Sequence, residues 1–184
     1  FCLYLAGLFC RAGKKVVWID ADPGQPFIGP PSVISLTAYT DAADLLKRKN
    51  PMIMSFIGNT SPVGRLLEMI SGLQKLYALA QSLDPGLVLI NTCGLVNGGA
   101  ARELKFHEID MLSPRSVIAL PEVRRAISKY ALRPDVWVVS FEMMAEALKN
   151  PPPKPIYDEM ARFMTHDNQV SDYMGEFSAE VAPR

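Results

Sequence analysis

The sequence predicts an α/β fold with a mainly parallel sheet covered by helices on both faces. Short apolar runs with strand character alternate along the chain with segments whose apolar residues recur at helical spacing. Several of these runs end abruptly in acidic, amide or glycine residues. Strands that alternate with helices favour parallel pairing, because a parallel connection has to cross the sheet and usually does so through a helix.

The composition is that of an ordinary globular protein. The chain has 184 residues, of which 49% are hydrophobic and 21% charged, so it is long enough to bury a core. Its 19 basic residues balance 19 acidic ones, which excludes a strong overall positive field, although a local basic groove suffices to hold a polynucleotide end. Cys2, Cys10 and Cys93 lack metal-ligand spacing and are interpreted as reduced, buried thiols of a cytoplasmic protein.

The apolar N-terminus predicts a buried helix rather than a membrane segment. Ten apolar residues cannot span a bilayer, and the pattern lacks the basic start and cleavage site of a signal peptide. We therefore expect no membrane partner. In the first part of the chain, helices are predicted over 1–12 and 40–48, and strands over 16–20, 33–36 and 52–57.

The alternation continues through the second part of the chain. A long helix is predicted to begin at Pro62, because proline after serine is a typical helix start. The strands expected after it are 86–90, 116–120 and 136–140, and the helices are 99–112, 122–132 and 142–149. The proline run 151–153 predicts a boundary between an α/β domain over 1–150 and a lid or tail over 151–184, with an appended helix near 156–174.

The run VVWIDADPGQP places Asp20 and Asp22 directly after a buried strand. Open α/β sheets bind their ligands at the carboxyl ends of the strands. Two carboxylates at this position are suited to hold a hydrated Mg²⁺ or to take a proton from a hydroxyl group. The alternative is a turn in which each aspartate caps local backbone amides.

Two further strand ends carry polar residues. LVLINTCG resembles the strand end of nucleotide hydrolases, with Asn91 in place of the usual aspartate. The loop 58–62 (GNTSP) would bind phosphate through its hydroxyls and a following helix N-terminus, and Ser61 as a plain helix cap explains it equally well. His107 and His166 are isolated and are not expected to be ligands.

The chain contains no G-x-x-x-x-G-K-[ST] loop. The helix at 1–12 followed by a strand is the arrangement that normally comes after such a loop. We therefore expect the phosphate loop to end just before Phe1, and we expect the chain as given to be inactive on its own.

Three motifs together carry a family resemblance: IDADPGQPFIGPPSVISL, FIGNTSP and INTCGLVNGGAARELKFHEIDMLSPRSVIAL. In this order, over residues 1–120, they resemble the polynucleotide 5′-hydroxyl kinases of the RNA cleavage and pre-ribosomal RNA processing machineries and their prokaryotic relatives. The resemblance implies a P-loop NTPase-type kinase domain that uses ATP and Mg²⁺. It would transfer the γ-phosphate to the 5′-hydroxyl end of RNA or DNA.

The same resemblance assigns roles to individual residues. Asp22 would activate the attacking hydroxyl and touch the Mg²⁺ shell, and Asp20 would support the metal. Gln25 would order the loop or a water, while Thr92 and Gly94 would line the phosphate face.

On the substrate side, Thr60 and Ser61 would hold the polynucleotide end. Leu95 stands where eukaryotic members have tryptophan, and Arg162 is the one clear lid arginine after Pro155. Two alternatives remain: a non-catalytic ATP-binding scaffold of an RNA-processing complex, and a P-loop ATPase of the partition or metal-cluster carrier type. Protein partners stay open.

Overall fold

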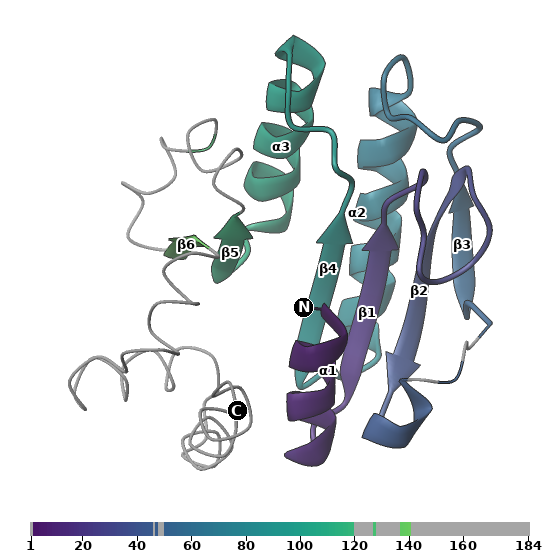
Figure 1. Cartoon of the computed structure of the whole chain (residues 1–184), viewed down its shortest axis with the longest axis vertical. Coiled ribbons are helices and arrows are strands. Elements are labelled where there is room, and N and C mark those ends of the chain that lie inside the picture. The colour runs from purple at the N-terminus through teal and green to yellow at the C-terminus, as the bar shows by residue number, and fades with distance from the viewer. Residues whose placement is uncertain (1, 46, 48–49, 120–126, 128–136, 141–184) are drawn as a thin grey trace, which may run out of the picture. The chain divides into compact units, whose positions relative to one another are not determined.

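The computed structural model describes residues 2–45, 47, 50–119 and 127, together with the backbone of 137–140 (Figure 1). The chain divides into two compact units, residues 1–114 and 115–184. In the second unit, the described residues form two parallel strands, β5 (Ser116–Ala119) and β6 (Trp137–Ser140). The predicted boundary at 151 lies outside the described residues and stays a prediction.

The first unit is built on a four-stranded sheet. Its spatial order is β3 (Ile53–Phe56), β2 (Val33–Tyr39), β1 (Val16–Ala21) and β4 (Leu87–Thr92). β1 and β4 are parallel, whereas β2 is antiparallel to both of its neighbours. Three of these four strands therefore run in one direction. β2 runs against them because a loop rather than a crossover helix joins it to β1.

Helices cover both faces of this sheet (Figure 1). α1 (Cys2–Arg11) packs on β1 and β4, and α2 (Leu66–Ser82) packs on the opposite face against β1, β2 and β3. α3 (Gly99–Leu112) packs against α2. The predicted α/β class, with a sheet between helices, is confirmed.

The core lies between the sheet and α2. Alternate residues of β1 point to opposite faces, and Val17 and Ile19 join Met69 and Leu73 of α2 in one buried cluster. The other face of β1 carries Trp18 and Asp20. The Trp18 indole stacks on Phe27, with ring centroids 5.2 Å apart, so the loop after β1 folds back over its own strand.

Two predicted helices differ from the structure. The helix expected over 40–48 is reduced, among the described residues, to one 3-10 turn (Ala42–Asp44), in which the Asp41 carboxylate accepts the Ala43 amide at 2.8 Å. α2 begins at Leu66 rather than Pro62 because Gly64 has a left-handed backbone, with φ of +77°, which a helix cannot contain. The predicted helix 142–149 and the predicted lid lie outside the described residues, and so does the predicted helix 122–132 apart from Ile127.

The remaining predicted elements of the first unit are confirmed within a few residues, and the 99–112 helix matches at both ends. In the described part of the chain, no helix has the length and apolar character needed to cross a bilayer.

Candidate functional site

The predicted site residues of β1 and β4 meet at one edge of the sheet. The parallel register places Asp20 beside Asn91 and Ala21 beside Thr92. Both strands end here, so the loops that start at Asp22 and at Cys93 leave the sheet side by side (Figure 1). This carboxyl edge is where open α/β sheets bind ligands.

Asp20 anchors the loop that follows β1. Its side chain is fully buried, and its Oδ2 accepts hydrogen bonds from the backbone N–H groups of Phe27 and, at 2.9 Å, Ile28. Its Oδ1 accepts from the Asn91 side-chain amide at 3.1 Å. A buried carboxylate needs such donors, because an unpaired charge in the interior is very costly. The structure thus gives Asp20 a part in shaping the loop, and its role as a metal ligand stays a prediction.

The Asn91 amide explains the departure from the aspartate of nucleotide hydrolases at this strand end. An amide nitrogen can donate to Asp20, whereas a carboxylate in its place would set two like charges at hydrogen-bond distance. The thiol of Cys2 contacts the same side chain, with Sγ 3.8 Å from Asn91 Oδ1. Burial raises the pKa of the Cys2 thiol, and the nearby charge of Asp20 adds to this effect.

Asp22 is only half buried and closes a short turn. Its Oδ1 accepts the backbone N–H groups of Gly24 at 2.9 Å and Gln25 at 3.1 Å. Both hydrogen bonds go to Oδ1, so Oδ2 keeps its capacity to accept a proton or to bind a cation. The Gln25 side chain is exposed beside this turn. The alternative in which Asp22 caps local backbone amides therefore holds for Oδ1. Oδ2 still has the capacity to accept a proton or to bind a cation.

The loop 58–65 comes to the same place and touches the loop after β1. A Cβ atom added at Gly24 would lie 2.8 Å from the carbonyl oxygen of Thr60. The carbonyl oxygen of Ser32 accepts the backbone N–H groups of Ile57 and Gly58, which joins the two loops at a second point. The structure therefore brings Thr60 next to the Asp22 turn, although 38 positions separate them in the sequence.

Ser61 does not cap a helix. Its Oγ accepts the Val63 N–H at 3.3 Å, and its own N–H donates to Asn59 Oδ1 at 3.2 Å, so residues 59–63 form consecutive turns. α2 starts only at Leu66. The alternative of a plain helix cap at Ser61 is therefore wrong, and α2 does not supply a helix N-terminus directly after this loop.

The turn after β4 forms a third side of the candidate site, beside the Asp22 turn and the loop 58–65. Thr92 is exposed, and a Cβ atom at Gly94 would meet nothing within 4 Å, so this turn has open space around it. Cys93 between them is buried. Burial raises the pKa of its thiol, although the charge of Lys105 opposes this effect.

Under this turn lies a buried ion pair that sequence reasoning missed. Lys105 Nζ is 3.0 Å from Glu108 Oε2 and 3.8 Å from Cys93 Sγ. Burial raises the pKa of the Glu108 carboxyl above its ordinary value, even with the Lys105 ammonium beside it. The sequence contained one sign that this pair is buried. Both residues lie on the helix face that also carries Leu104 and Leu112, and the helical spacing predicts that this face is buried.

Other candidates are not brought to this edge. His107 is exposed and lies 3.9 Å from Glu103 on the surface of α3. His166 and the predicted lid Arg162 lie outside the described residues. Among the residues that the structure describes, no three of His, Cys, Asp and Glu gather in a cluster that would hold a metal.

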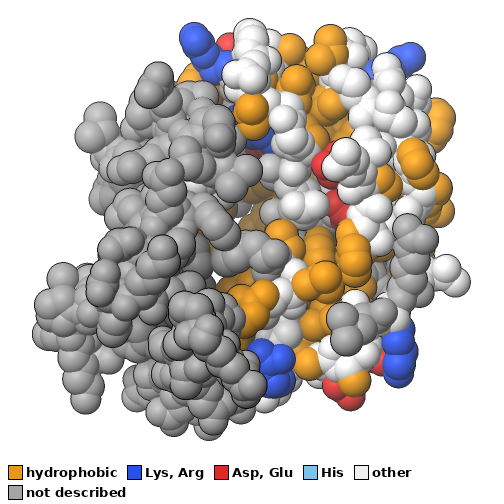
Figure 2. Space-filling view, in the orientation of Figure 1, with side chains coloured by type: hydrophobic (Ala, Val, Ile, Leu, Met, Phe, Trp, Pro, Cys, Tyr) orange, Lys and Arg blue, Asp and Glu red, His pale blue; other side chains and the backbone are white. Residues whose placement is uncertain are grey.

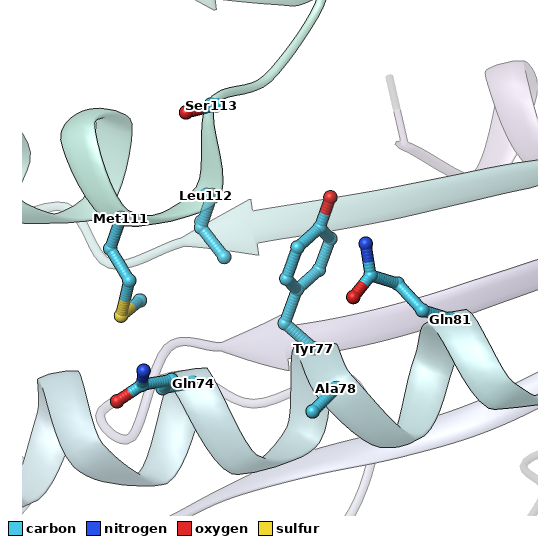
Figure 3. Close-up of a pocket in the computed structure, with 7 residues that line it drawn as sticks. All are labelled: Gln74, Tyr77, Ala78, Gln81, Met111, Leu112 and Ser113. Carbon is cyan, nitrogen blue, oxygen red and sulfur yellow. The ribbon is translucent and has the colours of Figure 1, made fainter.

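A groove of about 470 Å³ lies between α2 and the end of α3 (Figure 3). Figure 3 shows the ring of Tyr77 between Leu112 of α3 and the amide of Gln81, and none of the predicted site residues lines this groove. The groove is therefore separate from the candidate site at the carboxyl edge of the sheet.

The sequence of the chain is similar to those of several known proteins. The chain is 34% identical over 117 residues to the polyribonucleotide 5′-hydroxyl-kinase of Methanocaldococcus jannaschii, a match that covers 64% of this chain and 32% of that protein. It is 35% identical over 118 residues to the protein of the same name from Pyrococcus horikoshii, with the same coverage. A CLP1 homolog from Brugia malayi is 32% identical over 110 residues, which cover 53% of this chain and 24% of the relative.

These alignments span about a third of the length of the archaeal relatives. A family model described as the P-loop of the mRNA cleavage and polyadenylation factor CLP1 matches residues 1–147, most of the chain. P-loop families bind nucleotides through a glycine-rich loop, so membership implies nucleotide use. The chain belongs to the CLP1 P-loop family.

Proposed function

We propose that this protein transfers the γ-phosphate of ATP to the 5′-hydroxyl end of a polynucleotide, either RNA or DNA. The contact between Gly24 and the Thr60 carbonyl carries this proposal, because it joins a carboxylate turn to a hydroxyl-bearing loop at the ligand-binding edge. The names of the archaeal relatives support the reaction and the class of acceptor.

In this reaction, the 5′-hydroxyl oxygen forms a bond to the γ-phosphorus, and the bond from that phosphorus to the bridging oxygen of ADP breaks. Asp22 Oδ2 accepts the hydroxyl proton, since both of its turn hydrogen bonds go to Oδ1. Thr60 and Ser61 hold the polynucleotide end, while Gln25, Thr92 and Gly94 border the phosphates. Catalysis is mainly positioning and charge neutralisation, as in other phosphoryl transfers.

The residues present fit a magnesium ion that keeps most of its water. Mg²⁺ in phosphoryl-transfer sites typically takes one or two carboxylates and the substrate's phosphates. Asp22 offers one uncommitted carboxylate oxygen at the surface, and Asp20 is tied behind it by three hydrogen bonds. Asp22 would hold the ion through one of the ion's own waters, so that Oδ2 stays able to accept the hydroxyl proton. The ion would neutralise charge on the phosphates, and Asp20 would fix the loop that carries Asp22.

Asp22→Asn tests this assignment in the protein as its gene encodes it. The amide oxygen can still accept the Gly24 and Gln25 amides, so the turn survives while the base and the charge are lost. We expect transfer of labelled γ-phosphate to a 5′-hydroxyl oligonucleotide to fall at least 100-fold, with ATP binding retained. Asp41→Asn is the matched control, because Asp41 also caps a local amide and belongs to the turn after β2. Full activity of Asp22→Asn would overturn the proposal.

A second candidate is a non-catalytic ATP-binding scaffold of an RNA-processing complex, and the match to a family model described as the P-loop of an mRNA cleavage and polyadenylation factor supports it. The same labelling experiment separates the two, since only a kinase labels the oligonucleotide end. A P-loop ATPase would instead release inorganic phosphate without an oligonucleotide acceptor.

A further inference from the structure

Strand β3 carries an exposed apolar row beside the candidate site. It is an edge strand of the described sheet, and its residues Phe56 and Met54 are 75% and 51% exposed. Met52, just before the strand, is 56% exposed. Figure 2 shows hydrophobic side chains at the surface along this edge of the sheet, on the right of the view. Single exposed apolar residues are common, but a row of them on an edge strand is a feature of a binding surface.

The row lies on the face of β3 that α2 does not cover. Ser55 points to the opposite face, where its Oγ would be 2.6 Å from a Cβ atom added at Gly72 of α2. Because side chains alternate along a strand, Met54 and Phe56 share the other face. Phe56 is the last residue of β3, so it is the member of the row at the carboxyl edge of the sheet.

The strand register places Phe56 close to the carboxylates. Met54 pairs with Ser35, which pairs with Asp20, so Met54 lies two strands, roughly 10 Å, from Asp20. Phe56 is two residues farther along its strand, roughly 7 Å nearer to the edge at which the Asp22 turn begins. A polynucleotide that leaves the Asp22 and Thr60 loops in the direction of β3 would pass within reach of this ring.

The Phe56 ring lies against the backbone of Gly58. A Cβ atom at Gly58 would lie 3.3 Å from Cε1 and 3.6 Å from Cζ of Phe56, so one edge of the ring rests on Gly58. Gly58 has φ of +80°, and its N–H is bound to the Ser32 carbonyl. The same loop leads directly to Thr60. An exposed aromatic ring beside the loop proposed to hold a nucleic-acid end is suited to stack on a base.

We propose that Phe56 is a stacking platform for a base near the 5′ end of the polynucleotide. This inference rests on the proposed function and adds to it a residue that stacks on the face of a base. Such stacking has no preference for one base, because every base has a π-face. The substrate contact is then shared between Thr60 and Ser61, which hold the end, and Phe56, which holds a nucleotide behind it.

The test compares Phe56→Ala with Phe56→Trp in the protein as its gene encodes it. Binding of a fluorescent 5′-hydroxyl oligonucleotide is measured by anisotropy, together with KM and kcat for phosphorylation. Loss of one stack weakens binding by roughly 5-fold or more. We expect this rise in Kd and in KM for Phe56→Ala with kcat little changed, and recovery with Phe56→Trp. Leu79→Ala, at another exposed apolar residue, is the control and leaves Kd unchanged.

Oligonucleotides with an abasic site at each of the first four positions locate the stack. At one position, removing the base abolishes the difference between wild type and Phe56→Ala. If Phe56→Ala binds as wild type does, or if its defect is the same with every abasic oligonucleotide, the stacking proposal is wrong and the row belongs to a protein contact or to folding. Phosphorylation that depends on Asp22 in the same experiment would still uphold the proposed function. A wild-type protein that does not bind the oligonucleotide would overturn both.

Discussion

Strands β1 and β3 run in the same direction in one sheet, yet their environments are opposite. Every residue of β1 is buried, whereas three of the four residues of β3 are exposed. β1 lies between two strands and between two helices, so its last residues are held by many contacts. Among the described residues, β3 pairs on one side only, with β2. The central strand therefore positions the chemistry, and the edge strand is available for contact with another molecule.

The largest effect that separates the two strands is expected at Asp20. Asp20→Ala leaves two backbone amides and the Asn91 amide without their acceptor, and each such loss costs roughly 1–3 kcal/mol. We expect the free energy of unfolding, measured in urea, to fall by about 3 kcal/mol or more. Met54→Ala on β3 is the control, and a change within about 0.5 kcal/mol is expected there. Equal losses of stability in Asp20→Ala and Met54→Ala would contradict the different environments of β1 and β3.

A smaller effect is expected where the loops of β1 and β3 meet. Gly24→Ala would place a methyl group 2.8 Å from the Thr60 carbonyl oxygen, so one loop has to move. We expect a loss of about 1–2 kcal/mol in stability and, in the kinase assay, a fall in kcat/KM that exceeds what the stability loss explains. Gly99→Ala, where the added methyl meets nothing within 4 Å, is the matched control. Unchanged kinetics of Gly24→Ala would show that loop spacing does not matter.

The smallest effect concerns the buried pair beneath the β4 turn. Burial raises the pKa of Glu108 in the folded chain. A carboxyl group of this kind stabilises the fold at pH values below its unfolded pKa, and this contribution is lost as pH rises toward the folded pKa. Glu108→Gln cannot titrate. We therefore expect the wild type to lose stability relative to Glu108→Gln as pH rises above 4.5, the ordinary pKa of a glutamate. A difference that is independent of pH, measured by urea unfolding across these pH values, would contradict the raised pKa.

The sequence predicted the strand ends better than the connections between them. The runs before Asp20 and Asn91 are apolar and rich in β-branched residues, and such runs form buried strands in most contexts. The helix predicted from Pro62 began four residues late because a left-handed glycine, which has no signature of its own, interrupts the segment. The 40–48 segment became a 3-10 turn in its described part, since a short helix without a strong apolar face depends on tertiary contacts.

The two aspartates show the same limit at the site. Both belong to one DxD pattern, and the sequence could name both as candidates for metal or proton chemistry. The fold separates them: Asp20 faces inward, where three donors reach it, and Asp22 keeps one oxygen uncommitted at the surface. The Lys105–Glu108 pair escaped prediction because i, i+3 charges on a helix are usually solvated, and only packing buries them.

By itself, the sequence determined the α/β class, the strands that end in polar residues and the order of the motifs, since these depend on local hydrophobic pattern and residue type. Only the tertiary structure decided that β2 turns back, that Gly24 touches Thr60, and that Phe56 stands exposed beside them. These features depend on which segments pack together across long separations in the chain. A local pattern does not say which distant segments come into contact, because the order and register of the strands in the whole sheet decide those contacts.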